Sequence, residues 1–205
     1  MPKTKVSNNK WTLERVLPWM LVVIGVIGTL CAGIIMYEKL HLLENPNYQT
    51  ACDINPIISC GSVMQSDQAE AFGFPNPFLG LIGFPIVATI GGALLAGATF
   101  KRWFWRAAQA GMLFALLFVH WLFYQAVYHI GALCPWCMVV WTVTILGFWY
   151  LLLYNLRHKH IPTPASLTRA VAFAQRHHLD ILVVWYLVIT ALILQHFWYY
   201  FGRNL

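Results

Sequence analysis

Charged residues are scarce in this sequence, and acidic ones are the scarcest. Only 10% of its 205 residues are Asp, Glu, Lys or Arg, and seven of these are acidic. A chain with so few charges and 60% hydrophobic residues has the composition of an integral membrane protein, as does its mean hydropathy of +0.63. The net charge of +6 does not indicate nucleic-acid binding, because the positive residues gather at the ends of hydrophobic runs.

Other familiar features are also missing. The sequence shows no glycine-rich nucleotide-binding motif, so a bound flavin or NAD has no support. It shows no internal repeat of fixed period. The first hydrophobic run (17–37) is too long for a signal peptide and has no convincing cleavage site before Glu38, so we expect it to be a membrane anchor rather than a cleaved leader.

Five hydrophobic runs are each long enough to cross a bilayer, which takes about 20 residues in a helix. They cover residues 17–37, 78–100, 107–130, 135–156 and 181–201. The sequence therefore predicts an all-α integral membrane fold. We expect four parts: an N-terminal segment (1–16), a four-helix core with a long loop (17–156, loop 42–77), a second loop (157–180), and a fifth helix with the C-terminus (181–205).

The positive residues orient these helices. With five spans, one face of the membrane receives most of them: Lys3, Lys5, Lys10, Arg15, Lys101, Arg102, Arg106, Arg157, Lys159, Arg169 and Arg176. Only Lys39 and Arg203 fall on the other face. The positive-inside rule makes the rich face cytoplasmic. The N-terminus, the 1–16 segment and the 157–180 loop are then cytoplasmic, and the C-terminus is extracytoplasmic.

A C-x-x-C motif, Cys134-Pro-Trp-Cys137, lies between the third and fourth hydrophobic runs. Proline directly after Cys134 is typical of the first position of a helix, which makes Cys134 the N-cap and places Cys137 in the first turn. The helix dipole and the unpaired N–H groups there favour a thiolate, and a lowered cysteine pKa makes a sulfur reactive. We therefore expect the start of the helix to stabilise a Cys137 thiolate.

The 42–77 loop carries a second cysteine pair, Cys52 and Cys60. Loops of this length are uncommon and usually functional. Ser62-Val-Met-Gln65 fits a capping box that opens a short helix, which we expect to lie as a half-helix cap over the bundle. Inside the spans, Cys31 is expected to be a packing residue, and His120 is expected to form an interhelical hydrogen bond or to take part in redox chemistry.

Three explanations suit four cysteines in two pairs: two structural disulfides, a zinc site of four thiolates, or a relay of two exchanging disulfides. The seven-residue gap in the first pair is unusual for zinc, and structural disulfides do not need a C-x-x-C motif at a helix start beside lipid. All four cysteines fall on the extracytoplasmic face, where disulfides persist. A relay also needs a dithiol donor and a lipid-soluble acceptor, and a quinone suits an apolar pocket with few polar groups.

These motifs together resemble the vitamin K epoxide reductase family, and its bacterial members most closely. The resemblance rests on Cys52-Asp-Ile-Asn-Pro-Ile-Ile-Ser-Cys60-Gly-Ser-Val-Met, Ser66, Phe74-Pro-Asn-Pro-Phe-Leu-Gly80 and Cys134-Pro-Trp-Cys137, and covers residues 17–154. It implies four helices around a quinone (menaquinone or ubiquinone), covered by the loop and the half-helix.

The resemblance also implies roles for individual residues. Cys134 and Cys137 are the active-site pair, with Cys137 meeting the quinone, and Cys52 and Cys60 are the shuttle pair. Asn76 donates a hydrogen bond to a quinone oxygen, Ser66 supports the shuttle loop, and Met64 lies above the pocket. Trp141 stands where the animal enzymes have a tyrosine, and its indole N–H can donate a hydrogen bond but cannot accept one.

The resemblance favours a thiol:quinone oxidoreductase of the bacterial inner membrane that drives disulfide formation. Its electrons would come from a separate extracytoplasmic thioredoxin-like (DsbA-like) protein, since no such domain follows the fifth span. Two alternatives remain at this stage: an epoxide or quinone reductase of the animal type, and a structural or zinc-binding membrane protein.

Overall fold

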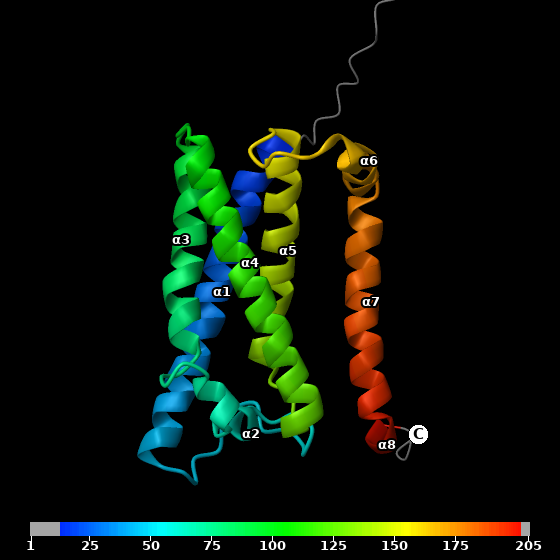
Figure 1. Cartoon of the computed structure of the whole chain (residues 1–205). Helices are drawn as coiled ribbons and strands as arrows, with labels where there is room; N and C mark the ends of the chain where they lie inside the picture. Colours follow the sequence, from blue (N-terminus) through cyan, green and yellow to red (C-terminus); the bar gives the residue numbers. More distant parts are fainter. Residues whose placement is uncertain (1–12, 202–205) are drawn as a thin grey trace, which may run out of the picture.

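The computed structural model describes residues 13–201, and their regular structure is helical (Figure 1). The elements are α1 (Leu13–Glu44), α2 (Cys60–Met64), η1 (Asp67–Glu70), α3 (Pro77–Leu95), α4 (Arg102–Gln125), η2 (Ala126–Ile130), α5 (Pro135–Arg157), η3 (Ala165–Leu167), α6 (Thr168–Arg176), α7 (His178–His196) and α8 (Trp198–Phe201). Within residues 13–201, five helical segments are long and hydrophobic enough to cross a membrane. The predicted all-α membrane fold is thus confirmed.

Helix α1 is longer than the hydrophobic run that predicted it. Its 32 residues span about 48 Å at 1.5 Å per residue, against a hydrocarbon core of about 30 Å. The hydrophobic run stops before Glu38, but the helix continues to Glu44. The last turns of α1 therefore extend past the hydrocarbon core at the end where α2 lies (Figure 1).

The four-helix core is built on a tight pair, α1 and α3. A Cβ atom added at Gly91 of α3 would lie 2.6 Å from the Pro18 carbonyl oxygen and 2.7 Å from the Val22 nitrogen, both in α1. Small residues allow membrane helices to approach this closely. Helix α5 packs against both α1 and α4, and these contacts close the bundle on that side.

Helix α7 lies beside the bundle and is mostly exposed: 6% of the residues in its most hydrophobic stretch are buried. Its Trp185 indole N–H donates to His120 Nε2 in α4 over 3.1 Å. Since Nε2 accepts, the protonated Nδ1 donates to the Leu116 carbonyl at 2.8 Å. Both nitrogens of His120 are thus used, which confirms the expected interhelical hydrogen bond.

The half-helix begins earlier than the sequence pattern predicted. The N-cap of α2 is Ser59, whose Oγ accepts a hydrogen bond from the Ser62 nitrogen at 3.1 Å, and Gln65 is the C-cap. The capping box predicted from Ser62 to Gln65 is therefore wrong. The physical reason is the carboxylate of Asp53, which accepts from the Gly61 nitrogen at 3.0 Å and from the Ser59 hydroxyl at 2.8 Å, and so fixes the helix start at Ser59.

A π-helical turn, η2, and Gly131 end the third span. Gly131 has a φ of 71°, a left-handed conformation that glycine adopts without steric cost. The chain then turns back, with Cys134 as the N-cap of α5 and Pro135 at its first position, as the C-x-x-C motif predicted. Helices α4 and α5 are antiparallel neighbours (Figure 1).

Candidate functional site

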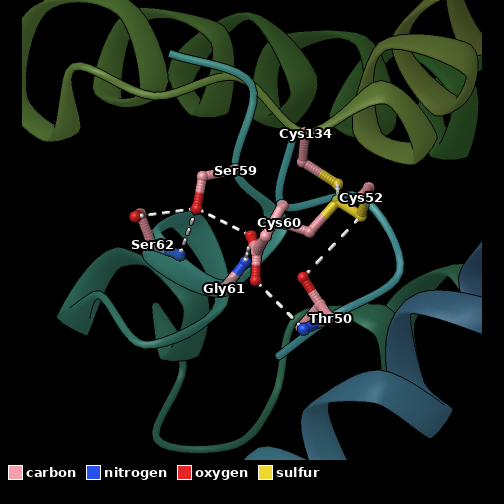
Figure 2. The surroundings of a disulfide bond; sticks show 8 residues. Thr50, Cys52, Ser59, Cys60, Gly61, Ser62 and Cys134 are labelled. Carbon is pink, nitrogen blue, oxygen red and sulfur yellow. Dashed lines mark hydrogen bonds between the residues drawn. A yellow bond between two sulfur atoms is a disulfide. The ribbon is translucent and has the colours of Figure 1, made fainter. Parts of the chain in front are cut away.

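Three sulfur atoms meet where the long loop covers the bundle (Figure 2). Cys52 and Cys60 form a disulfide. The Sγ of Cys134 lies 3.0 Å from the Sγ of Cys60, and all three sulfurs lie within 4.8 Å of one another. Cys134 and Cys137 are free, as is Cys31, which is buried in α1. The structure therefore brings the two cysteine pairs together.

A backbone bridge sets this meeting point. Ile58 pairs with Leu133 in an isolated parallel bridge, in which the Leu133 nitrogen donates to the Ile57 carbonyl at 2.6 Å and the Ser59 nitrogen donates to the Leu133 carbonyl at 3.1 Å. Cys60 and Cys134 follow directly. Sequence reasoning missed this bridge, whose only local signal is two adjacent β-branched residues, Ile57 and Ile58, in a polar loop.

Asp53 fixes the shape of the shuttle loop, the 42–77 loop that carries Cys52 and Cys60. Besides its bonds to Gly61 and Ser59, its carboxylate accepts from the Thr50 nitrogen at 3.0 Å. Burial on its own raises the pKa of Asp53, but the hydrogen bonds from Gly61, Ser59 and Thr50 outweigh it and leave the pKa lowered. These bonds favour the charged carboxylate, so the loop is best ordered when Asp53 is ionised.

Asp53→Asn is expected to loosen the loop. At neutral pH, a water-soluble phosphine should reduce the Cys52–Cys60 disulfide about fivefold faster, which corresponds to roughly 1 kcal/mol of net hydrogen bonding. Because the pKa of Asp53 is depressed in the folded protein, the stabilisation is complete above the ordinary carboxyl range and is lost as pH falls through the folded-state pKa. The native protein should therefore approach the variant's reduction rate in acid.

The matched control is Asp67→Asn, which removes an exposed carboxylate from the same loop. Its reduction rate should equal that of the native protein. Equal rates for Asp53→Asn and the native protein at neutral pH would contradict the assigned role of Asp53.

Cys134 is the sulfur that the start of α5 stabilises. A hydrogen bond from the Cys137 side chain lowers the pKa of Cys134, and the backbone N–H groups of Cys137 and Trp136 lower it further. Burial and the Asp53 carboxylate act against these bonds without reversing the shift. The sequence predicts that the helix start stabilises a Cys137 thiolate, whereas in the structure the first N–H groups of the helix stabilise the N-cap sulfur of Cys134, which is 1% exposed.

A cavity of about 660 Å³ extends from the sulfurs into the bundle, between α1, α3, α4 and α5. Cys134 and Cys137 line it, and its walls are mostly apolar. The other polar residues on the wall are Lys39, Ser66, Gln68, Asn76, Gln125 and Thr144. Met64, Asn76 and Trp141, the three residues that the resemblance places at the quinone, line this wall, as does Ser66, which the resemblance assigns to the support of the shuttle loop.

Asn76 holds the chain that covers the cavity. Its Oδ1 accepts from the Ala71 nitrogen at 3.0 Å, and its Nδ2 donates to the Gln68 carbonyl at 2.7 Å. The amide has a second N–H that these bonds do not use. Ser66 donates its hydroxyl hydrogen to the Val63 carbonyl at 2.7 Å, next to the end of α2. Trp141 is 6% exposed, so it faces the cavity and the core rather than lipid.

The cavity suits a quinone better than the sulfur cluster suits a metal. Ligand sites of about 300–1,000 Å³ with apolar walls and a few polar groups are typical for compact organic ligands. A structural zinc site needs deprotonated thiolates, whereas two of the three clustered sulfurs are bonded to each other. The donor chemistry of the cluster is therefore that of disulfide exchange.

A multi-pass membrane bundle whose cavity reaches exchangeable cysteines defines a membrane oxidoreductase that works through thiols. The chain belongs to the vitamin K epoxide reductase family: the model of that family matches residues 19–152. The match covers the four-helix core and the loop, and it confirms the resemblance in the sequence. Among curated proteins no significant match was found. Membership in this family implies oxidoreductase activity with a quinone.

Proposed function

We propose that the protein is a thiol:quinone oxidoreductase that drives disulfide formation outside the cytoplasm. Electrons pass from a reduced thioredoxin-like protein to the shuttle pair, Cys52 and Cys60, then to Cys134 and Cys137, and finally to a quinone in the cavity. The observation that carries this proposal is the 3.0 Å approach of Cys60 to Cys134. Thiol–disulfide exchange requires such contact between an attacking sulfur and a disulfide.

The relay balances in four exchange steps. A partner thiolate attacks Cys52 and breaks the Cys52–Cys60 bond, and the second partner thiol then releases Cys52 and leaves the partner oxidised. The Cys60 thiolate attacks Cys134, which breaks the Cys134–Cys137 bond. Cys52 then attacks Cys60, restores the shuttle disulfide and leaves Cys134 and Cys137 as thiols.

The disulfide bonding of the structure corresponds to the end of this series of exchange steps. The shuttle pair is oxidised and the inner pair is reduced. A bound quinone supplies an acceptor for two electrons and two protons, which are the ones that Cys134 and Cys137 lose on forming a disulfide. Cys137 would face this acceptor, Asn76 would direct an N–H toward it, and Met64 and Trp141 would exclude water.

Charge supports the proposed orientation in a bacterial inner membrane. The α3–α4 turn, with Lys101 and Arg102, lies at the same end as Arg15 and Arg157, opposite α2 and α8 (Figure 1). By the positive-inside rule this end is cytoplasmic and the sulfurs are extracytoplasmic. The predicted contributions of Lys3, Lys5, Lys10 and Arg203 lie outside the described residues.

One assay tests the function. Purified protein in lipid nanodiscs should oxidise a reduced thioredoxin-like protein only when menaquinone or ubiquinone is supplied, and Cys134→Ala should abolish this oxidation. Oxidation that proceeds equally without quinone would reject the proposal. Reduction of vitamin K epoxide in the same assay would identify the animal-type activity instead.

Asn76→Ala is expected to weaken quinone use. Losing one N–H donor to a quinone oxygen should raise KM for the quinone about fivefold, since such a bond contributes roughly 1 kcal/mol. Gln68→Ala is the matched control, because it removes an amide from the same wall but keeps the backbone carbonyl that Asn76 bonds. Unchanged quinone kinetics in Asn76→Ala would remove this residue from the site.

A further inference from the structure

The outer end of α1 carries two adjacent charged residues that are both buried. Glu38 is 5% exposed and Lys39 is 6% exposed. Burial of a charge is costly unless the charge is paired and hydrogen-bonded. Neither residue belongs to the cysteine relay, so their burial calls for a separate explanation.

Lys39 binds both α2 and η1, the two short helices of the loop that covers the bundle. Its Nζ donates to the Met64 carbonyl at 2.8 Å and forms an ion pair with Glu70 Oε1 at 2.8 Å. Met64 is the last residue of α2, and Glu70 is the last residue of η1. A cation at the carbonyl end of a helix complements its dipole. One ammonium group thus ties α2 and η1 to α1.

Glu38 faces the other limb of the same loop. Burial raises the pKa of the Tyr48 hydroxyl, and the neighbouring Glu38 carboxylate raises it further. Tyr48 packs against the cluster that contains Cys52 and Cys60. Glu38 therefore lies near the part of the loop that precedes Cys52, whereas the next residue, Lys39, binds the part that follows Cys60.

We propose that Lys39 is a positioning residue of the relay, which clamps α2 onto α1 and so keeps Cys60 against Cys134. This inference rests on the proposed function, in which electrons cross between these two sulfurs. Helix α2 has only five residues and begins at Cys60, so a shift of its Met64 end also shifts the Cys60 sulfur. Directional bonds from one ammonium can also break and reform when the loop opens for a partner.

The test uses a full chain with Cys52→Ala and Cys137→Ala, which leaves Cys60 and Cys134 as facing thiols. Diamide accepts the two electrons and two protons that the Cys60 and Cys134 thiols lose when they form a disulfide. Mass spectrometry after alkylation gives the rate of this bond formation. Adding Lys39→Met should slow this rate about tenfold, because a loosened docking geometry is costly to a reaction between two positioned groups. Lys39→Arg should restore most of the rate.

Two further variants separate the clamp from general damage. Glu70→Gln changes the partly exposed partner of Lys39 without disturbing the interior, and it should slow Cys60–Cys134 bond formation severalfold. When it is combined with Lys39→Met, the rate should fall little further. Glu44→Gln removes an exposed charge from the same end of α1 and should leave the rate unchanged. An undiminished rate in both Lys39→Met and Glu70→Gln overturns the clamp. If the parent chain, with Cys52→Ala and Cys137→Ala but Lys39 intact, forms no Cys60–Cys134 bond, the relay itself is overturned.

Discussion

Replacing Cys137 with alanine is expected to lock the loop to the bundle through a Cys60–Cys134 disulfide. These sulfurs already lie 3.0 Å apart, and the backbone N–H groups of residues 136 and 137, which Cys137→Ala keeps, still stabilise a Cys134 thiolate that can attack Cys60. Without Cys137, no inner neighbour can displace Cys60 from Cys134. Turnover with quinone should fall on the order of a thousandfold or more, as is usual when a reacting group is removed.

Non-reducing peptide mapping of Cys137→Ala should find Cys60 linked to Cys134, with Cys52 free or bound to the partner. Cys31→Ala is the control: Cys31 is buried in α1 and should be dispensable for the relay. Recovery of a Cys52–Cys134 bond with Cys60 free would reverse the order of the shuttle cysteines while leaving the oxidoreductase function intact.

Gly83→Leu is expected to block the quinone cavity. Gly83 lies on the cavity wall, and a Cβ added there would meet nothing within 4 Å, so a leucine can enter the space without disturbing the backbone. Leucine also favours the helix over glycine. KM for the quinone should rise more than about tenfold, since the new side chain competes directly for the cavity volume.

The same helix offers a matched control. Gly92 also has open space around it, but it is not on the cavity wall, so Gly92→Leu should retain quinone use. In Gly83→Leu the exchange between Cys60 and Cys134 should continue in the absence of quinone. Normal quinone kinetics in Gly83→Leu would place the acceptor outside this cavity.

The sequence predicted the elements that depend on local composition. Hydrophobic runs located the five spans, and the proline after Cys134 located the start of α5. The details that depend on distant contacts were not predictable in this way. The start of α2 depends on Asp53, which lies outside that helix, and the docking of the loop depends on the bridge between Ile58 and Leu133.

Lys39 likewise has a role near the site that local sequence patterns could not predict. In the sequence it resembled a charge that marks the end of a membrane span. Its real partners lie 25 and 31 positions further along the chain, at Met64 and Glu70, and no local pattern connects them. Asn76 lies on the cavity wall, and its hydrogen bonds to Gln68 and Ala71 could be seen only in the folded chain.

The burial of the sulfurs has a consequence for traffic through the membrane. Cys52, Cys60 and Cys134 are 6%, 0% and 1% exposed. Small thiols in the surroundings therefore meet a shielded disulfide, and under the proposed function this shielding limits the loss of their electrons to the quinone. In the proposed relay, a molecule must displace the loop before it can reduce the Cys52–Cys60 disulfide, so the loop would insulate the relay from small reductants. Under the proposed function, this shielding would reserve the flow of electrons to the quinone for proteins that can dock on the loop.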